Sequence, residues 1–176
     1  EVPKVTVVPS TSGAGGVTFR TPKKSGLYSK SYLEQLIKIK YAGRVGELLL
    51  LGNEDEITTG ASNDIKQASE LIKQYITTYG MSDKFGMFDV SVLDGYISAN
   101  QDKIAEESSN IAKKMYNEVL DTLTKNRNTL RKIADQLIEK ESLTDSELDD
   151  IINSKAFTFI DIDELDCEPE LKVESI

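Results

Sequence analysis

The sequence predicts a mainly α-helical fold with a minor α+β component. Apolar side chains recur at helical spacing over most of residues 29–153, as in amphipathic helices. Near the N-terminus, two short β-branched runs flank a glycine-rich stretch, which is typical of a β-hairpin. The chain has 176 residues, of which 39% are hydrophobic, enough to bury the core of one domain.

The hairpin is the first element expected along the chain. Residues 4–8 form one β-branched run that ends at Pro9, and residues 16–20 form the second. The Ser-, Thr- and Gly-rich stretch at 10–16 lacks the Lys-Ser/Thr ending of a phosphate-binding loop, so a simple turn is the plainer interpretation.

A long apolar segment follows the hairpin and is expected to be helical. Ser29 or Ser31 can cap its start. Gly43 is expected to end or bend this helix, or to let another backbone approach closely. The pattern continues over 44–51, a very apolar stretch that should lie in the core, and Gly52 stops it.

A further helix is expected after an acidic loop at 53–61. Ser62 or Asn63 is its expected N-cap, and Gly80 occupies the position of a C-cap glycine. Its apolar positions follow a 3.6-residue period: Ile65, Ala68, Ile72, Tyr75, Ile76 and Tyr79.

The second half of the chain is also expected to be helical, after an irregular stretch at 81–96. One helix of about 25 residues should present Ile104, Ile111, Met115, Val119 and Leu123 on one face. A second helix should cover 126–140, and a short third one opens with a capping box at 144–147. Short links between these helices predict an antiparallel helical bundle whose apolar stripes form core.

The expected domain organisation has three parts. Residues 1–96 form an N-terminal subdomain with the hairpin and helices, residues 97–155 a helical subdomain, and residues 156–176 an acidic C-terminal tail. Residues 139–176 contain 13 acidic and 3 basic residues, and a solvated face or tail is the simplest interpretation of that run. Within the tail, residues 157–162 alternate as a strand does.

Composition excludes several functions. A net charge of −9 argues against nucleic acid as a partner, since phosphate binding needs a basic face. No apolar run reaches 18 residues, so no membrane contact is expected from this segment. A lone cysteine, Cys167, excludes a disulfide framework within this sequence and fits a reducing compartment. Because histidine is absent, these residues alone cannot build a Ser-His-Asp triad or a histidine-metal site.

Two acidic residues stand out as candidates for a site. Asp64 lies in the expected first turn of a helix, where carboxylates are favoured by the helix dipole, and this is the simpler explanation for it. Glu47 is a lone acid in an apolar helix, and such residues usually reach solvent or a cation such as Arg44.

Residues 58–65, Thr-Thr-Gly-Ala-Ser-Asn-Asp-Ile, resemble a segment of the FtsH-type ATP-dependent zinc metalloproteases. In that family the segment follows the zinc-binding helix and supplies the third metal ligand. Other blocks agree in order over residues 4–153. They are the hairpin runs 4–9 and 16–19, the stretch 42–47 (similar to Gly-Gly-Arg-x-Ala-Glu-Glu), the Tyr-Gly-Met-Ser element at 79–86, and 137–143.

The resemblance implies a zinc site to which this chain contributes Asp64. In the family, two histidines of a His-Glu-x-x-His helix and an aspartate bind Zn²⁺, and the glutamate is the general base for the water that attacks the peptide bond. The histidine helix would precede Glu1. Either the sequence begins after it, which the retained aspartate motif favours, or the natural protein lacks it and is a pseudoenzyme. No catalytic residue is expected within this chain, which by itself should be inactive.

Further expectations concern the parent protein and come from the same resemblance. They are polypeptide substrates, a homo-hexamer, ATP hydrolysed by a motor domain outside this sequence, and a cytoplasmic location, with or without a membrane tether. Glu47 is assigned a supporting role near the metal. Gly16, Val17, Thr18 and Phe19 could offer a strand edge to an extended substrate, and a plain hairpin explains them equally well. The alternative function is a non-catalytic assembly or adaptor domain of an AAA+ protein.

Overall fold

The computed structural model describes residues 2–9, 15–21, 26–92 and 95–154. Contacts divide the chain into two compact units. The sheet unit combines Glu1–Phe19 with Arg131–Ile176, and the helical unit is Arg20–Leu130. These two units are defined by spatial contacts, whereas the subdomains expected from the sequence, 1–96 and 97–155, follow chain order. The division into these subdomains stays a prediction. The acidic tail 156–176 and its strand-like run lie outside the described residues.

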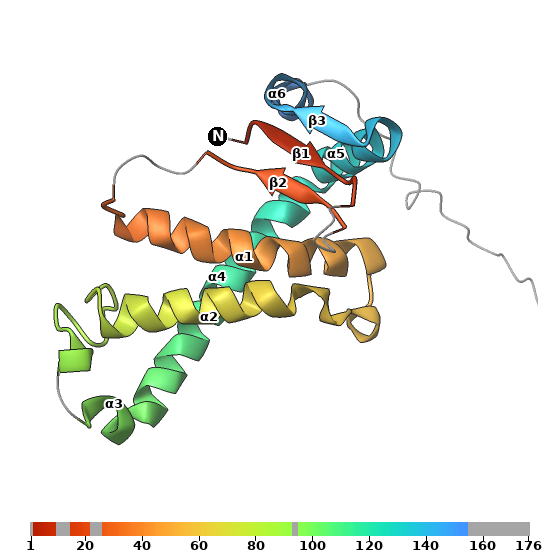
Figure 1. Cartoon of the computed structure of the whole chain (residues 1–176). Helices are drawn as coiled ribbons and strands as arrows, with labels where there is room; N and C mark the ends of the chain where they lie inside the picture. Colours follow the sequence, from red (N-terminus) through yellow and green to blue (C-terminus); the bar gives the residue numbers. More distant parts are fainter. Residues whose placement is uncertain (1, 10–14, 22–25, 93–94, 155–176) are drawn as a thin grey trace, which may run out of the picture. The chain divides into compact units, whose positions relative to one another are not determined.

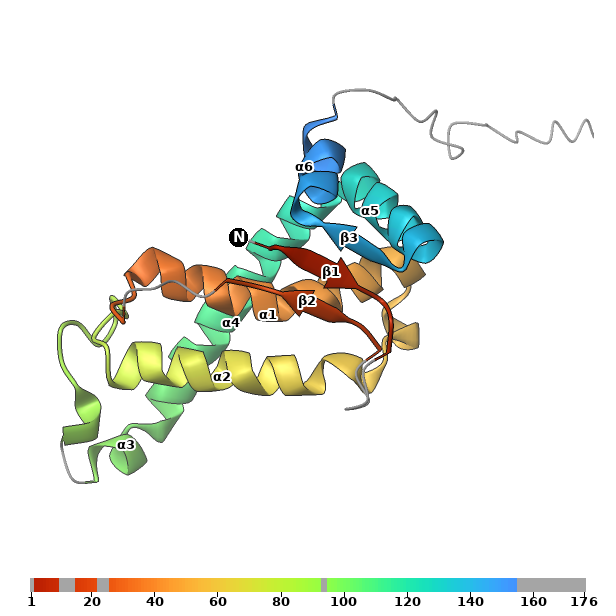
Figure 2. The same ribbon diagram turned by 45° about the horizontal axis from the view of Figure 1, so that its top comes forward.

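The helical unit is built on three long helices. α1 and α2 lie side by side and run in opposite directions, and α4 crosses both of them (Figures 1 and 2). Short 3₁₀ turns and one short helix complete the unit. Its elements are α1 (Lys30–Leu51), η1 (Glu54–Glu56), η2 (Thr59–Ala61), α2 (Ser62–Thr77), η3 (Val90–Val92), α3 (Tyr96–Ala99) and α4 (Gln101–Lys125).

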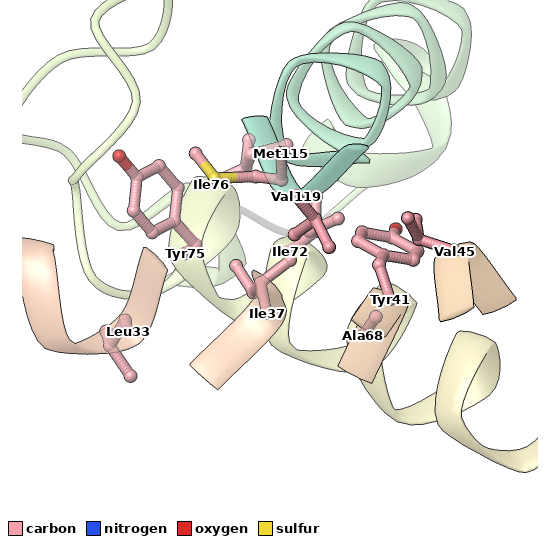
Figure 3. Packing of buried hydrophobic residues seen from close by; sticks show 10 residues of the cluster. All are labelled: Leu33, Ile37, Tyr41, Val45, Ala68, Ile72, Tyr75, Ile76, Met115 and Val119. Carbon is pink, nitrogen blue, oxygen red and sulfur yellow. The ribbon is translucent and has the colours of Figure 1, made fainter. Parts of the chain in front are cut away.

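The core of this unit draws on all three long helices. Figure 3 shows the side chains of α1, α2 and α4 pointing toward one another in the space between the helices. Tyr41 also meets Tyr116 edge to face, with ring centroids 6.3 Å apart. The buried set is Leu33, Ile37, Tyr41, Val45, Ala68, Ile72, Tyr75, Ile76, Met115 and Val119. The helical periodicity therefore marks core positions, as expected.

The two ends of α1 are where the sequence places them, but its interior is not interrupted. The Ser29 hydroxyl accepts the N–H of Tyr32 at 3.3 Å, and Gly52 ends the helix in the left-handed conformation, with φ of 68°. The expected break or close contact at Gly43 is wrong, since α1 continues through it and an added Cβ there would meet nothing within 4 Å. Burial of Tyr41 and Val45 on either side offsets the helix-weakening effect of glycine.

The limits of α2 differ from those expected. Ser62 and Asn63 lie inside the helix, and its N-cap is Ala61, which makes no side-chain hydrogen bond. The helix ends at Thr77, before Gly80. Gly80 instead has φ of 59°, and a Cβ on it would lie 3.1 Å from the Cα of Met87. It therefore permits a turn in which two backbone segments approach closely.

The sheet unit contains a three-stranded antiparallel sheet with strand order β2-β1-β3. The hairpin between β1 and β2 is confirmed, and β3 was not predicted. Val5 lies opposite both Thr18 of β2 and Leu143 of β3. The elements are β1 (Lys4–Thr6), β2 (Val17–Phe19), α5 (Arg127–Lys140, whose first residues belong to the helical unit), β3 (Ser142–Thr144) and α6 (Asp145–Asn153).

Leu143 is fully buried at the centre of the sheet unit. It packs with Leu137 and Leu148, and partly buried apolar residues surround these three: Val2, Val5, Ile133 and Ile151. The predicted capping box at the start of α6 is present, with Glu147 accepting the Thr144 N–H at 2.9 Å. That hydrogen bond, together with Lys140 and the Thr144 hydroxyl, lowers the pKa of Glu147 to about 2.

The mainly α fold with a small antiparallel β component is confirmed. The helices expected after residue 97 are present, but α4 finds its main packing partners in α1 and α2, from the first half of the chain. Among the described residues, no helix has both the length and the apolar character that a membrane span requires.

Candidate functional site

Asp64 lies on the first turn of α2, as the sequence predicts. Its Oδ1 is 3.1 Å from the ammonium nitrogen of Lys40 on α1. The Asp64 side chain is 48% exposed and that of Lys40 only 22%, so the pair sits at the boundary between core and solvent. The carboxylate complements the positive end of the α2 dipole and also joins the two helices.

Glu47 is held by three hydrogen bonds from two directions. Its Oε1 accepts the Thr58 N–H at 3.0 Å and the Thr58 hydroxyl at 2.6 Å, and its Oε2 pairs with Arg44 at 3.1 Å. The Thr58 hydroxyl and N–H, aided by Arg44, hold the pKa of Glu47 below its usual value. The expected pairing with Arg44 is present, and the link to Thr58 is an addition.

Through Thr58, Glu47 fixes the segment that leads to Asp64. The Thr58 hydroxyl also accepts the N–H of Gly60 at 3.2 Å and so caps η2. α2 follows η2 without an intervening loop, which sets where the first turn of α2 begins. The Thr-x-Gly spacing was the available sequence signal for this local turn, but nothing in the sequence indicated that Glu47 would hold it.

The proposed strand edge lies in the sheet unit. β2 occupies an outer position in the sheet, so within the described residues it pairs with a strand on one side only. Phe19 is 49% exposed. A Cβ on Gly16 would come within 2.7 Å of the carbonyl oxygen of Thr6, so glycine is needed there for the approach to β1.

A separate polar cavity of about 260 Å³ in the helical unit was not foreseen. The Tyr75 hydroxyl donates to Glu34 at 2.9 Å, and the buried Ser82 hydroxyl donates to Glu107 at 2.9 Å. Burial, with the hydrogen bond to Glu34, raises the pKa of Tyr75 above its ordinary value. The first hydrogen bond joins α2 to α1, and the second joins the segment after α2 to α4.

The side chains that this chain offers as ligands do not form a complete zinc site by themselves. Protein zinc sites use three or four nitrogen, sulfur or carboxylate ligands. The part of the chain that the structure describes brings no three His, Cys, Asp or Glu residues together in a metal-binding group, and the sequence has no histidine. Asp64 fits the chemistry of one carboxylate ligand, and in this structure its partner is Lys40.

Comparison with known proteins supplies the family. Residues 1–151 match the model of Peptidase family M41. Similar relatives are the ATP-dependent zinc metalloprotease FtsH of Lachnoclostridium phytofermentans, 39% identical over 88% of this chain and 26% of that protein, and FtsH 3 of Synechocystis, 33% identical over 86% and 27%. The chloroplastic FTSH 1 of Arabidopsis thaliana is 35% identical over 83% and 22%.

The chain therefore spans about a quarter of the length of these relatives. The family match covers residues 1–151, which include the segment around Asp64 and the residues of the hairpin, and these relatives match between 83% and 88% of the chain. The chain belongs to Peptidase family M41, as part of an FtsH-type zinc metalloprotease peptidase domain.

Proposed function

We propose that this chain is the part of an ATP-dependent zinc metalloendopeptidase that supplies the aspartate ligand of the metal, through Asp64. The observation that carries the proposal is the half-exposed Asp64 carboxylate on the first turn of α2, within a chain that matches Peptidase family M41 over residues 1–151. A carboxylate at such a place can be held in a fixed direction by the helix while it remains reachable.

In this proposal the remaining zinc ligands, the general-base glutamate and the ATPase belong to other parts of the parent protein. Zinc, when bound in such a site, supplies an activated water for hydrolysis of the peptide bond. The parent degrades unfolded or damaged polypeptides as a homo-hexamer, either free in the cytoplasm or tethered to a membrane with this domain on the cytoplasmic side. The chain alone, with no histidine, is inactive.

Glu47 serves this site as a positioning residue. Its carboxylate holds the N–H and hydroxyl of Thr58, and the segment that follows Thr58 leads directly into the first turn of α2. Since a loosened turn would let the Asp64 carboxylate move, a firm hold at Thr58 supports a fixed ligand direction.

The outer edge of β2 is proposed to pair with an extended substrate. In the part of the chain that the structure describes, β2 pairs on one side only, and the N–H and C=O groups along such an edge can pair with an added strand. Val17, Thr18 and Phe19 would provide the pairing backbone, and Gly16 the approach to β1.

A second function has one specific observation in its favour. The Asp64 carboxylate already has a counter-ion in Lys40, whose Nζ lies 3.1 Å from its Oδ1. This would suit a non-catalytic relative that serves as an assembly or adaptor domain of an AAA+ protein. In that case Asp64 and Lys40 form a structural ion pair between α1 and α2.

Zinc binding and proteolysis by the full-length protein separate the two functions. Asp64→Asn should weaken zinc binding on the order of 100-fold and abolish cleavage of an unfolded protein such as reduced casein. Glu70→Gln, which changes an exposed acid on the same helix, is the matched control and should change neither. A variant that keeps wild-type zinc affinity and cleavage would show that Asp64 is no ligand. A wild-type protein without zinc or cleavage would favour the adaptor function.

A further inference from the structure

Lys40 is the one partner that the structure gives to the Asp64 carboxylate among the described residues. Its Nζ lies 3.1 Å from Oδ1 of Asp64, and its side chain is largely covered, at 22% exposed. The next cation on α1, Arg44, is already paired with Glu47 at 3.1 Å. Lys40 and Arg44 thus each have a carboxylate of their own, and Glu47 is occupied by Arg44 and Thr58.

A charged side chain that is largely covered depends on its counter-ion. Removing charge from water is costly unless an opposite charge lies close, and Asp64 fulfils that need for Lys40. If a divalent cation took the carboxylate, Lys40 would lose its partner and face an added double positive charge a few ångströms away. Both effects oppose metal binding. Lys40 must then turn away toward solvent for the carboxylate to become available.

We infer that Lys40 competes with a divalent metal ion for the Asp64 carboxylate and so weakens the metal affinity of this site. This inference rests on the proposed role of Asp64 as a ligand. Lysine suits the role of a displaceable competitor, because its ammonium is a single point charge on a flexible stem. The ion pair therefore keeps Asp64 ordered without metal and makes metal loading an exchange of one cation for another.

The inference is tested by measuring the zinc affinity of variants that lack the positive charge of Lys40. The full-length protein is stripped of metal, and its zinc affinity is measured by competition with a chromophoric chelator. Lys40→Met, which keeps the covered apolar stem and removes the charge, should bind zinc about tenfold more tightly. Lys40→Arg, which keeps a cation, should remain within about threefold of wild type. Lys40→Gln is a second neutral variant in case Lys40→Met folds poorly.

Lys66→Met is the matched control, because Lys66 is an exposed lysine two residues after Asp64 on the same helix. It should change zinc affinity by less than about twofold, since exposed charges are strongly screened. A second readout is the rise in Tm on adding zinc, which should be larger for Lys40→Met than for wild type because a tighter ligand stabilises the folded state more.

The outcomes separate this inference from the proposed function. Equal or weaker zinc binding by both neutral variants, with Asp64→Asn still weakening it, would overturn the competition alone and make Lys40 an orienting residue. If Asp64→Asn leaves zinc affinity unchanged, or wild type binds no zinc, the ligand role of Asp64 fails, and the competition fails with it. If Lys66→Met also binds zinc more tightly, the gain comes from the change in net charge and not from Lys40 itself, and the inference is overturned.

Discussion

The helical unit and the sheet unit are stabilised in different ways. The helical unit is one continuous segment, Arg20–Leu130, with ten buried apolar residues from three long helices in its main cluster. The sheet unit joins two segments from opposite ends of the matched region around a cluster of three buried leucines. Burial dominates in the first, whereas the second depends on hydrogen bonds between distant residues, such as Val7 N–H to Glu141 O at 3.0 Å.

The two units nevertheless share one local device. In each, a glutamate carboxylate holds the N–H and hydroxyl of a threonine that begins a helical turn: Glu47 with Thr58 in the helical unit, and Glu147 with Thr144 in the sheet unit. A basic residue, Arg44 or Lys140, pairs with the second oxygen of each carboxylate. Hydrogen bonds of this kind fix the residue at which a helical turn begins.

The largest effect is expected from a cavity in the helical core. Ile37 is fully buried, and Ile37→Ala should lower the free energy of unfolding by about 3–4 kcal/mol, measured by urea titration. Ile39→Ala is the matched control, because Ile39 is on the same helix and 47% exposed. Its cost should stay below about 1 kcal/mol. Equal losses would mean that the core of this unit is not where the structure places it.

A smaller loss is expected in the sheet unit. Leu143→Ala removes the central buried side chain there and should cost about 2–3 kcal/mol, because a small core can partly close around the space. Ile138→Ala, at a residue that is 79% exposed on α5, should cost under about 0.5 kcal/mol. Hydrogen exchange at the β1 and β3 amides should show whether the loss is confined to this unit. Unchanged protection there would contradict it.

A single methyl group tests the hairpin. Gly16→Ala places a Cβ 2.7 Å from the carbonyl oxygen of Thr6, so β1 and β2 must shift apart, at a cost of about 1–2 kcal/mol. Gly15→Ala is the neighbouring control, where an added Cβ meets nothing within 4 Å. Thermal unfolding should give a lower Tm for the first variant only. The same loss from both would indicate an effect on the loop rather than the strand contact.

The smallest effect concerns acid. The pKa of Glu147 is lowered from 4.5 to about 2 in the folded state, so its stabilisation is present above pH 4.5 and is lost as the pH falls toward 2. Glu147→Gln should therefore be less stable than wild type at pH 6, and the difference should shrink by pH 2. Urea titrations at both pH values measure it. A difference that persists at pH 2 would exclude ionisation as its source.

Local patterns predicted much of the fold. The Ser29 cap, the Gly52 stop, the hairpin and the capping box at Thr144 each depend on a few neighbouring residues, and each is confirmed. α1 continues through Gly43 because packing at Tyr41 and Val45 outweighs the preference of one glycine. At the start of α2, the helix continues directly from the η2 turn, and neither Ser62 nor Asn63 is the N-cap, in contrast to the prediction.

Contacts between distant segments could not be predicted from such patterns. β3 has three residues, and only its pairing with β1 makes it a strand. Likewise Asp64 was placed correctly on a helix start, but its pairing with Lys40 connects residues on two helices. The hydrogen bond from the Thr58 hydroxyl to Glu47 likewise joins residues on either side of a loop. A single sequence carries no periodic signal for pairs of this kind.

The pairing of β1 with β3 has a consequence for biosynthesis. Thr6 and Ser142 meet although 136 residues separate them. On the ribosome, the helical unit has all of its residues once Leu130 has emerged, while β1, made much earlier, still waits for its second neighbour. The nascent chain should thus complete its helical part first and close the sheet only near the end of this region. A ribosome stalled between these points would expose one side of β1 to chaperones.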